Sequence, residues 1–455
     1  MMSPNQTRRR ALLAAAALAS LSPAAPAWAQ ALKQTAKAAG PARIVIVGAG
    51  VGGASTAKYL KLFSPELDVT LIDRNPNYVR HYGSSEVVVG TKTIEDMTVS
   101  YDALKSKYGV KVVQDTVTGL DPDRKEVVGE AGRYPYDKLV VAPGVELLYD
   151  AVPGYSAELA ATKIPSGWIA GPQTVLLAKQ LQAMPEGGTF VIVSPPNPYR
   201  CPPGPYERTA LVTEWCAKHN PRAKIINLDP KNDFVTDATM ILGWNRLYGY
   251  PIPKAYQEKL APFASPGRAD CALEWVTEKE GGRTLSIDPD RMIVKTVGGD
   301  VKADVLNIVP PMHAADVALR MGLADKTNFC PVNRVDFQST IIPEVYVIGD
   351  ASIADAMPKS GFSANTQAKN TARAIVETLA GRELPEPAWS NTCYALAGHD
   401  YGIFVADVFR IIEGKIARTN TRERYQFLTA GATEQALAAM YLDSWMNTIT
   451  EDSFG

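Results

Sequence analysis

The chain has 455 residues, enough for roughly two or three domains, and 46% hydrophobic against 21% charged residues, so it can bury a large core. Its formal net charge is −1, from 47 lysines and arginines and 48 aspartates and glutamates. This balance gives no electrostatic basis for binding nucleic acid or an anionic membrane surface, and the composition indicates a globular protein of enzyme size.

The first 29 residues have the pattern of a signal peptide. Arginines at positions 8–10 precede the apolar run 11–19, and the small-residue sequence AWA at 27–29 is a cleavage site. An apolar run this short cannot span a bilayer, which needs ~20 residues, so we expect a removed signal rather than a transmembrane anchor. The arginine pair predicts the twin-arginine route to the periplasm, and an ordinary secretory signal is the alternative.

A dinucleotide-binding unit is predicted to begin with the apolar strand 43–47. The strand leads into a G-x-G-x-x-G pattern formed by Gly48, Gly50 and Gly53, and a helical run follows. Gly48 permits the tight turn, Gly50 lets the backbone approach a pyrophosphate, and Gly53 lets the helix pack closely on the strand. The N-terminus of the helix then favours the phosphate charge.

The acidic residue of such a fingerprint is Asp73. It ends a second apolar strand, 68–72, and is placed to bind a ribose hydroxyl, with Arg74 beside it as a further expected cofactor contact. Because two strands, the glycine pattern and the acid occur in the required order, the sequence predicts a dinucleotide site far more specifically than a glycine pattern alone would.

Two later segments favour FAD over NAD as this dinucleotide. The segment that ends at Gly144 is typical of the strand and turn that return the chain across an FAD site. A later strand ends in Gly349 and Asp350, where a carboxylate can hold the flavin ribityl chain. Lys359 precedes a helix predicted over 363–380, whose N-terminal partial positive charge would favour electron density on the reduced flavin. The order of these segments predicts an FAD-binding domain that is split around an insert.

The predicted fold is therefore α/β. It has two Rossmann-like dinucleotide-binding domains, as in glutathione-reductase-like flavoproteins, and a smaller α+β C-terminal domain. The signal peptide covers 1–29, the split FAD-binding domain covers 42–155 and 315–384, the second NAD-like domain covers 156–314, and the C-terminal interface domain covers 385–455.

The second domain lacks a nucleotide fingerprint. Its first predicted strand, 188–193, is followed by SPPNPYRCPPGP at 194–205, where a glycine-rich turn would stand. Prolines remove the backbone N–H donors that bind phosphate, so a nicotinamide is not the expected reductant. The turn contains Cys201 instead, and Glu207 and Arg208 follow on the next predicted helix.

Cys330 is the second cysteine of interest, in the loop before the last strand of the FAD-binding domain. In a split domain the loops of Cys201 and Cys330 can converge on the flavin, where their disulfide would take two electrons from a thiol-like donor. A structural disulfide or two unrelated thiols is the alternative. The remaining cysteines, Cys216, Cys271 and Cys393, are expected to include buried thiols, and their spacings match no zinc pattern, so no metal site is predicted.

Six segments carry a resemblance to a known family: YRCPPGPYER, ADVLNIVPP, CPVN, VIGDASIADAMPKSGFSANTQAK, NTCYA and SWMNTITEDSFG, in this order. They resemble the flavoprotein subunit of flavocytochrome c sulfide dehydrogenase. The resemblance implies a periplasmic FAD-dependent enzyme that oxidises sulfide to sulfur or polysulfide and reduces a c-type cytochrome subunit, with which it forms a heterodimer. It also implies that Cys201 and Cys330 form a redox disulfide next to FAD and that Glu207 handles protons. Pairing of Glu207 with Arg208 is the alternative.

The resemblance has one departure. The chain has His81 where members of that family often carry the cysteine that attaches FAD covalently. A histidine can form its own flavin linkage or hydrogen-bond to the ring edge, and non-covalent FAD is the expectation. Trp445 matches an aromatic residue that lies, in the family, by the flavin on the haem side, although core packing is the commoner use of a lone tryptophan. The haem attachment pattern C-x-x-C-H does not occur, so haem is expected only in a partner subunit.

Two other functions stay open. One is a membrane-associated sulfide:quinone oxidoreductase, which requires an amphipathic insertion surface, whereas the C-terminal sequence TEDSFG is acidic. The other is an accessory thiol–disulfide flavoprotein that reactivates a sulfur-oxidising partner and turns over little sulfide itself. The sequence also leaves open which of the two cysteines takes the sulfide.

Overall fold

The computed structural model describes residues 40–419 and 424–455. The predicted signal peptide, 1–29, lies outside the described residues. A five-stranded parallel sheet carries the glycine pattern, and strand β1 is buried over residues 44–47, as expected for a central strand covered on both faces. In spatial order its strands are β20 (Val345–Val347), β9 (Lys138–Val141), β1 (Arg43–Val47), β2 (Asp68–Asp73) and β5 (Lys111–Gln114).

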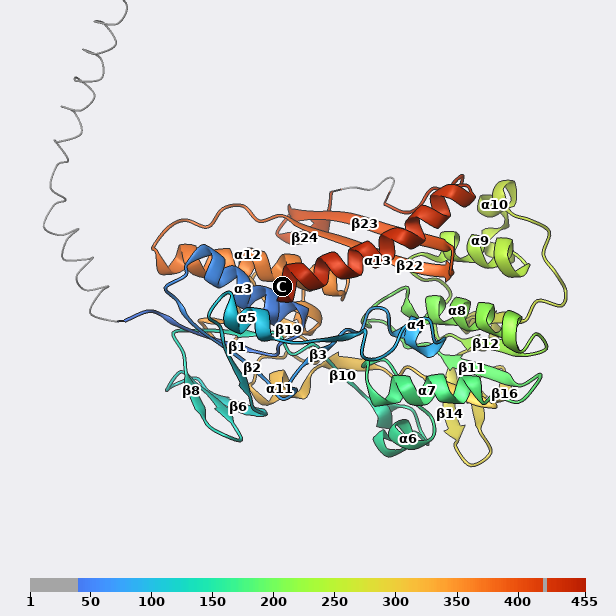
Figure 1. Ribbon diagram of the computed structural model, residues 1–455, viewed down its shortest axis with the longest axis horizontal. Helices are drawn as coiled ribbons and strands as arrows, with labels where there is room; N and C mark the ends of the chain where they lie inside the picture. Colours follow the sequence, from blue (N-terminus) through green and yellow to red (C-terminus); the bar gives the residue numbers. More distant parts are fainter. Residues whose placement is uncertain (1–39, 420–423) are drawn as a thin grey trace, which may run out of the picture. The chain divides into compact units, whose positions relative to one another are not determined.

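Helices α3 (Val51–Phe63) and α12 (Gly361–Leu379) pack against each other beside this sheet (Figure 1). The close approach depends on small residues: a Cβ added at Gly52 would lie 3.6 Å from the Cβ of Ala364. Helix α12 begins two residues before the predicted position 363, because the Ser360 side chain caps it by accepting a hydrogen bond from the Ser363 N–H at 3.1 Å.

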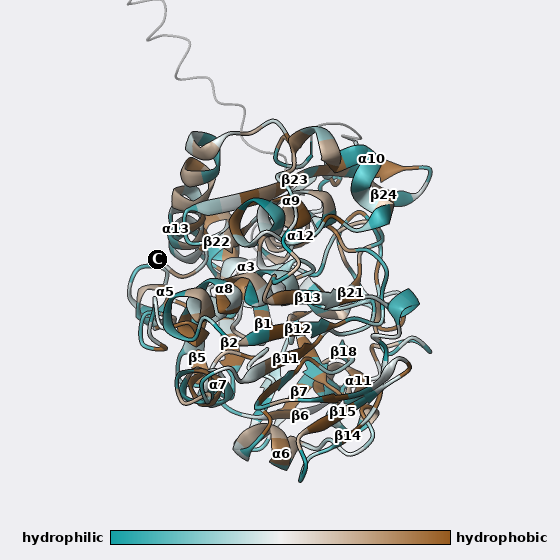
Figure 2. Cartoon of the chain, turned by 90° about the vertical axis from the view of Figure 1, so that its right-hand side faces the viewer, coloured by the Kyte–Doolittle hydropathy of each residue, from teal (hydrophilic) through white to brown (hydrophobic). Residues whose placement is uncertain are grey.

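A second, four-stranded parallel sheet forms the middle of the chain. Helix α8 begins at Gly204, since prolines suit the first turn of a helix, where their missing N–H is not needed. Figure 2 shows the apolar strand β11 in brown. The sheet order is β13 (Leu273–Val276), β12 (Lys224–Leu228), β11 (Thr189–Val193) and β17 (Val305–Ile308), with helices α7 (Pro172–Gln182), α8 (Gly204–His219) and α9 (Asp237–Tyr248).

The C-terminal part is an antiparallel sheet of β22 (Trp389–Gly398), β23 (Tyr401–Ile412) and β24 (Lys415–Arg418), followed by helix α13 (Ala432–Phe454). Strand β22 contacts both α8 and α12, and α13 contacts β22, β23 and α3 (Figure 1). The C-terminal part therefore contacts elements of both parallel-sheet regions. The predicted α/β class with a smaller α+β C-terminal domain is confirmed.

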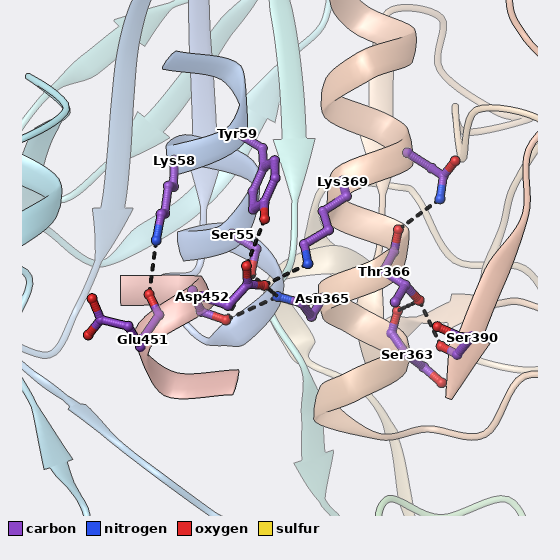
Figure 3. Close-up of polar contacts among 12 residues, drawn as sticks. Ser55, Lys58, Tyr59, Ser363, Asn365, Thr366, Lys369, Ser390, Glu451 and Asp452 are labelled. Atoms are coloured by element: carbon purple, nitrogen blue, oxygen red, sulfur yellow. Dashed lines mark hydrogen bonds and ion pairs between the residues drawn. The ribbon is translucent and has the colours of Figure 1, made fainter. Parts of the chain in front are cut away.

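Polar contacts fix the end of α13 to α3 and α12 (Figure 3). The Asp452 carboxylate accepts hydrogen bonds from the Tyr59 hydroxyl and the Asn365 amide, both at 2.7 Å, and lies 2.7 Å from the Lys369 ammonium. The Lys58 ammonium donates to the Glu451 carbonyl at 2.9 Å. Among the described residues, no helix combines the length and hydrophobicity that a membrane span requires.

Shorter elements connect these parts. They are β3 (Tyr78–Val79), α4 (Ser84–Val88), β4 (Thr98–Val99), α5 (Asp102–Ser106), β6 (Val117–Asp121), β7 (Glu126–Gly129), β8 (Arg133–Pro135), β10 (Val145–Leu147), α6 (Ala157–Thr162), α10 (Gln257–Leu260), β14 (Thr284–Asp288), β15 (Ile293–Thr296), β16 (Gly299–Lys302), β18 (Met312–Ala314), α11 (Asp316–Arg320), β19 (Cys330–Pro331) and β21 (Ser352–Ile353).

Candidate active site

A cavity of about 850 Å³ lies at the carboxyl ends of β1, β2 and β9. This volume is in the upper part of the roughly 300–1,000 Å³ range of cofactor and ligand sites. Its walls come from the glycine-rich turn, from the turn after β11 and from the C-terminal sheet and helix. The predicted site residues that line it are Gly48, Gly50, Asp73, Arg74, His81, Gly144, Cys201, Glu207, Gly349, Asp350 and Trp445.

Three predicted site residues, Gly53, Lys359 and Cys330, are not among the lining residues. Gly53 lies behind the turn, where an added Cβ would be 1.8 Å from the Gly48 carbonyl oxygen. The Lys359 ammonium is held inside the fold, because it donates hydrogen bonds to the carbonyls of Asp350 at 2.7 Å and Ser352 at 3.1 Å. Gly53 and Lys359 therefore support the cavity wall from behind.

The glycine-rich turn is held by the ends of two neighbouring strands. Gly48 has a φ of +93°, and a Cβ there would lie 2.4 Å from the Ala142 carbonyl oxygen, so only glycine fits. The Asp73 carboxylate accepts a hydrogen bond from the Ala49 N–H at 2.7 Å. Gly50 faces the open cavity, since the nearest atom to an added Cβ is a Tyr78 ring carbon at 3.7 Å. This turn leaves backbone N–H groups at the start of α3 free for a pyrophosphate.

Asp350 gives an independent test of whether the cavity fits FAD. Its Oδ1 atom is buried and has no hydrogen-bond partner among the described residues, and burial raises the pKa of the carboxyl group, against the opposing charges of Arg200 and Lys359. A buried carboxylate oxygen without a partner fits a ligand that carries hydroxyl groups, as the ribityl chain does. Gly361, at the N-terminus of α12, also lines the cavity. The residues present therefore fit FAD.

Cys201 is held in the cavity wall by a constrained loop. It has a φ of 60°, a left-handed conformation that is uncommon for a residue with a side chain. Its N–H donates to the Lys359 carbonyl at 2.9 Å, and its carbonyl accepts from the Gly204 N–H at 2.9 Å. A Cβ added at Gly204 would meet both Cys201 Sγ, at 3.0 Å, and the Trp168 ring, at 2.6 Å. The Cys201 thiol and the Trp168 indole therefore both face Gly204.

Cys330, the predicted partner of Cys201, is buried behind the cavity wall. Cys330 lies in β19, whose backbone pairs with Ser352 of β21, and its thiol is fully buried outside the cavity. Burial raises the pKa of Cys330 to about 12, against the positive charge of Lys359. No disulfide is formed among the described residues, which include all five cysteines. Cys330 does not line the cavity, but its strand and the Cys201 loop both meet Lys359, whose carbonyl accepts from the Cys201 N–H at 2.9 Å and whose ammonium donates to the carbonyl of Ser352, the strand partner of Cys330, at 3.1 Å. The pairing of Cys201 with Cys330 stays a prediction.

Cys393 is a further cysteine close to Cys201. It lies in β22, lines the cavity, and has its Sγ 3.5 Å from the Asn391 Oδ1. Burial, then the charges of Glu207 and Cys393, raise the pKa of Cys201 to about 12. Burial raises the pKa of Cys393 to about 11, with a contribution from Glu207. Two thiols and one carboxyl group therefore meet at one part of the wall.

Glu207 is the titratable group nearest neutral pH in this cluster. Burial raises its pKa to about 8, although it accepts a hydrogen bond from the Leu396 N–H at 2.9 Å. The alternative, an ion pair between Glu207 and Arg208, does not match the hydrogen bonds that Arg208 makes. The Arg208 guanidinium donates instead to the carbonyls of Ser166 and Gly167 and to the Asn307 side chain, each at 3.0 Å. Glu207 is thus left free to exchange a proton.

His81 and Trp445 both reach the cavity. The His81 Nδ1 accepts a hydrogen bond from the Ala170 N–H at 3.0 Å, and burial lowers the pKa of the ring well below its ordinary value. The ring is therefore neutral, with its proton on Nε2. Trp445 stacks on Phe362 with ring centroids 6.5 Å apart and meets the edge of Tyr82 at 5.5 Å.

The former nucleotide position of the second domain is filled by protein. Asp229 follows β12, where a Rossmann fold places the ribose-binding acid, and it is fully buried. Its carboxylate accepts hydrogen bonds from the Tyr206 hydroxyl at 2.6 Å and the Trp275 Nε1–H at 2.9 Å, and lies 2.7 Å from the Lys231 ammonium. A nicotinamide nucleotide cannot reach this acid. The sequence signal for Asp229 is an acid directly after the second strand of this domain.

Comparisons with known proteins agree with this geometry. The family model of the pyridine nucleotide-disulphide oxidoreductases matches residues 42–166. The central-domain model of the flavocytochrome c sulfide dehydrogenase flavoprotein chain matches 174–310, and the flavin-binding model of the same enzyme matches 385–454. The three matches follow one another along the described chain.

Two relatives match over most of the chain. The sulfide-quinone reductase of Aquifex aeolicus is 25% identical over 382 residues, covering 80% of this chain and 83% of the relative. The mitochondrial sulfide:quinone oxidoreductase of Dictyostelium discoideum is 26% identical over 329 residues, covering 70% and 67%. The X-ray structure of the sulfide:quinone oxidoreductase from Aquifex aeolicus superposes with a TM-score of 0.66 at 20% identity, covering 90% of this chain and 92% of that one, which shows a shared fold.

Proposed function

The chain belongs to the family of FAD flavoproteins that includes the flavoprotein chain of flavocytochrome c sulfide dehydrogenase, and from this we propose that it oxidises sulfide at Cys201 and Cys393 and passes the electrons to a c-type cytochrome. The observation that carries the proposal is the meeting of Cys201, Cys393 and Glu207 on the wall of the cavity that fits FAD. The Cys201–Cys330 pair expected from the sequence is the alternative.

The chain's own residues divide into holding and reacting groups. The turn at Gly48 and Gly50, Asp73, Asp350 and the N-terminus of α12 would hold the FAD, which accepts two electrons together and can release them singly. Cys201 and Cys393 are the reacting groups, and both are partly exposed residues of the cavity wall.

We propose that the oxidised enzyme contains a Cys201–Cys393 disulfide. Hydrosulfide attacks one of these sulfurs, the S–S bond breaks, a persulfide forms on the attacked sulfur, and the other sulfur leaves as a thiolate that carries the electron pair. The proton of the persulfide passes to the Glu207 carboxylate. Atoms and charge balance in this step, since one anion is consumed and one thiolate is formed.

Glu207→Gln is expected to remove the titration of this step. In the native protein the rate of flavin bleaching by sulfide should rise as pH increases through about 8, where Glu207 becomes the ionised base. The variant should be slower by about 10²-fold at high pH and should lack this rise. Stopped-flow absorbance from pH 6 to 9.5 under anoxia measures both quantities. An unchanged pH profile in the variant would remove Glu207 from the mechanism.

The same substitution has a readout that does not depend on activity. The pKa of Glu207 is raised from 4.5 to about 8 in the folded protein, so within this interval the folded state binds a proton that the unfolded chain releases. The free energy of unfolding contributed by Glu207 therefore falls as pH rises through the interval. In Glu207→Gln the decline of stability between pH 5 and 8 should be smaller, as measured by denaturant unfolding.

The choice of electron acceptor rests on the two domain models. Both flavocytochrome c models match, at 174–310 and 385–454, and these segments include Cys201, Cys393 and Trp445. A quinone is the second candidate, because the relatives from Aquifex aeolicus and Dictyostelium discoideum are named for quinone reduction. Purified protein with sulfide should reduce cytochrome c in preference to a soluble quinone, and the opposite preference would favour the second candidate.

We also propose export to the periplasm by the twin-arginine route, a stable complex with a haem-bearing subunit, and non-covalent FAD. The mass and visible spectrum of the protein purified from the periplasm test these points together. Release of FAD on denaturation supports non-covalent binding, whereas FAD mass retained on the peptide that contains His81 would show a covalent link.

A further inference from the structure

Glu86 is a buried acid that the proposed sulfur chemistry does not yet use. It lies on α4, lines the cavity and is only 9% exposed. Its Oε2 atom is buried and has no hydrogen-bond partner among the described residues, while its Oε1 lies 3.6 Å from the Lys92 ammonium. A buried carboxylate with one unpartnered oxygen costs stability, so its place in the cavity wall points to a function.

Titratable groups from several elements interact with Glu86. Its negative charge raises the pKa of Glu207 on α8, which places the two carboxyl groups within electrostatic reach. Burial raises the pKa of Glu86, and the negative charge of Asp443 on α13 raises it further. The charges of Lys92 and of His399, in the β22–β23 turn, lower it. Lys92 therefore joins the buried acid Glu86 to the exposed acid Asp443.

The outer end of this series reaches solvent. The Lys92 ammonium lies 2.6 Å from the Asp443 carboxylate, and the Asp443 side chain is 60% exposed. Lys92 itself is 23% exposed. In order from the cysteines to the surface, the groups are Glu207, Glu86, Lys92 and Asp443. Glu86 is the only member of this series that both lines the cavity and contacts Lys92.

Sulfide oxidation creates a need for such a series. Oxidation of H₂S to the level of elemental sulfur releases two electrons and two protons. A haem acceptor takes electrons one at a time and no protons, so both protons must leave through the protein. Cys201 and Cys393 hold protons strongly, because burial raises both thiol pKa values, and Arg208 is occupied by carbonyl acceptors.

We propose that Glu86 is a proton-relay residue that takes the proton from Glu207 and releases it to water beside Lys92 and Asp443. The inference rests on the proposed sulfide oxidation and adds the exit of its protons. In each transfer the carboxyl group of Glu207 loses one proton, the carboxylate of Glu86 gains it, and Glu86 then loses it to solvent, so both acids return to their starting states.

Glu86→Gln tests the relay, because glutamine keeps the shape of the side chain but cannot carry a proton. With the full-length, FAD-loaded protein, the rate of flavin reduction by sulfide should fall about 10- to 10²-fold, and its solvent deuterium isotope effect should increase. Proton release, followed with a pH indicator in weak buffer, should lag behind bleaching. Added formate should restore part of the rate, which a merely structural role of Glu86 would not allow. Reduction of the bound flavin by dithionite should be unchanged.

Two further variants keep the test decisive. Glu95→Gln removes an exposed acid of the loop that follows α4 and should match the native protein in every readout. Lys92→Met leaves Glu86 in place but removes its contact with the surface, so it should slow proton release even if Glu86→Gln does not fold. Native protein that sulfide does not bleach would overturn the proposed function. If sulfide bleaches the native protein, and Glu86→Gln and Lys92→Met show the same rate, isotope effect and proton release as the native protein, the relay is rejected and the proposed function stands.

Discussion

Replacing Cys201 or Cys393 with serine is expected to abolish reduction of the bound flavin by sulfide. Each variant removes one sulfur of the proposed disulfide, and a hydroxyl group can neither be attacked by hydrosulfide nor leave with an electron pair, so the rate should fall by at least about 10³-fold. Bleaching of the flavin absorbance in an anoxic stopped-flow instrument measures the rate directly. FAD content should stay unchanged, because neither cysteine belongs to the residues proposed to hold the cofactor.

Cys330→Ala is the matched control for this pair. It removes a thiol that is fully buried outside the cavity, in β19, whereas Cys201 and Cys393 are partly exposed. Alanine is a small apolar replacement for a buried free cysteine, so the variant should fold, bind FAD and be bleached at the native rate. Loss of bleaching in Cys330→Ala, together with retention in Cys393→Ser, would support the Cys201–Cys330 pair expected from the sequence and reject the proposed Cys201–Cys393 pair.

Gly53→Ala is expected to prevent formation of the FAD-loaded protein. The added Cβ would lie 1.8 Å from the carbonyl oxygen of Gly48, and both groups belong to the backbone. Gly48 cannot move away, because its N–H donates to the Ile72 carbonyl at 2.8 Å and an added atom on its other side would meet Ala142. Overpacking of this kind should lower the free energy of unfolding by at least about 3 kcal/mol, as measured by denaturant unfolding.

Gly50→Ala separates folding from cofactor binding. Gly50 has a φ of −71°, which alanine adopts readily, and the nearest atom to an added Cβ is 3.7 Å away. Stability should therefore stay within about 1 kcal/mol of the native protein. FAD retention should nevertheless fall, since the methyl group faces the cavity where the pyrophosphate would approach the backbone. A Gly50→Ala protein that purifies with one FAD per chain would contradict this placement of the pyrophosphate.

The FAD half of the fold is predictable from the sequence because its signals are local. Strand, glycine turn, helix and Asp73 occur within one short segment, and each residue has a steric or hydrogen-bonding role that the segment itself imposes. The limits of helix α12 differ from the prediction by only a few residues, because a serine cap rather than the first apolar residue sets its start.

The partner of Cys201 could not be derived in the same way. Disulfide connectivity depends on which distant loops meet, and the sequence alone does not determine it. Cys330 and Cys393 both follow the second domain, but β19 pairs with β21 and holds Cys330 inside, whereas β22 lies against α8 and brings Cys393 to Glu207. The segment NTCYA contains Cys393 and was a signal that could have directed attention to it.

Glu86, Trp168 and Asp229 were missed for a related reason. Glu86 and Trp168 belong to no motif, and although Asp229 follows a strand as a ribose-binding acid would, its contacts with distant elements decide its role. Trp168 reaches Gly204, beside the Cys201 loop, from a loop before α7, and Asp229 is fixed by Tyr206 and Trp275. Lys359 was expected at the cofactor but is turned inward by two carbonyl acceptors, a hydrogen-bonding choice that residue type alone does not reveal.

The most direct test of the central claim is a non-reducing peptide map of the oxidised, FAD-loaded protein. After blocking of free thiols and proteolysis, mass spectrometry should find the peptide of Cys201 linked to the peptide of Cys393, with Cys330 alkylated. Anoxic treatment with sulfide should convert the link into a persulfide on one of the two cysteines. A link between Cys201 and Cys330, or free Cys201 and Cys393 in oxidised protein that sulfide still bleaches, would contradict the account.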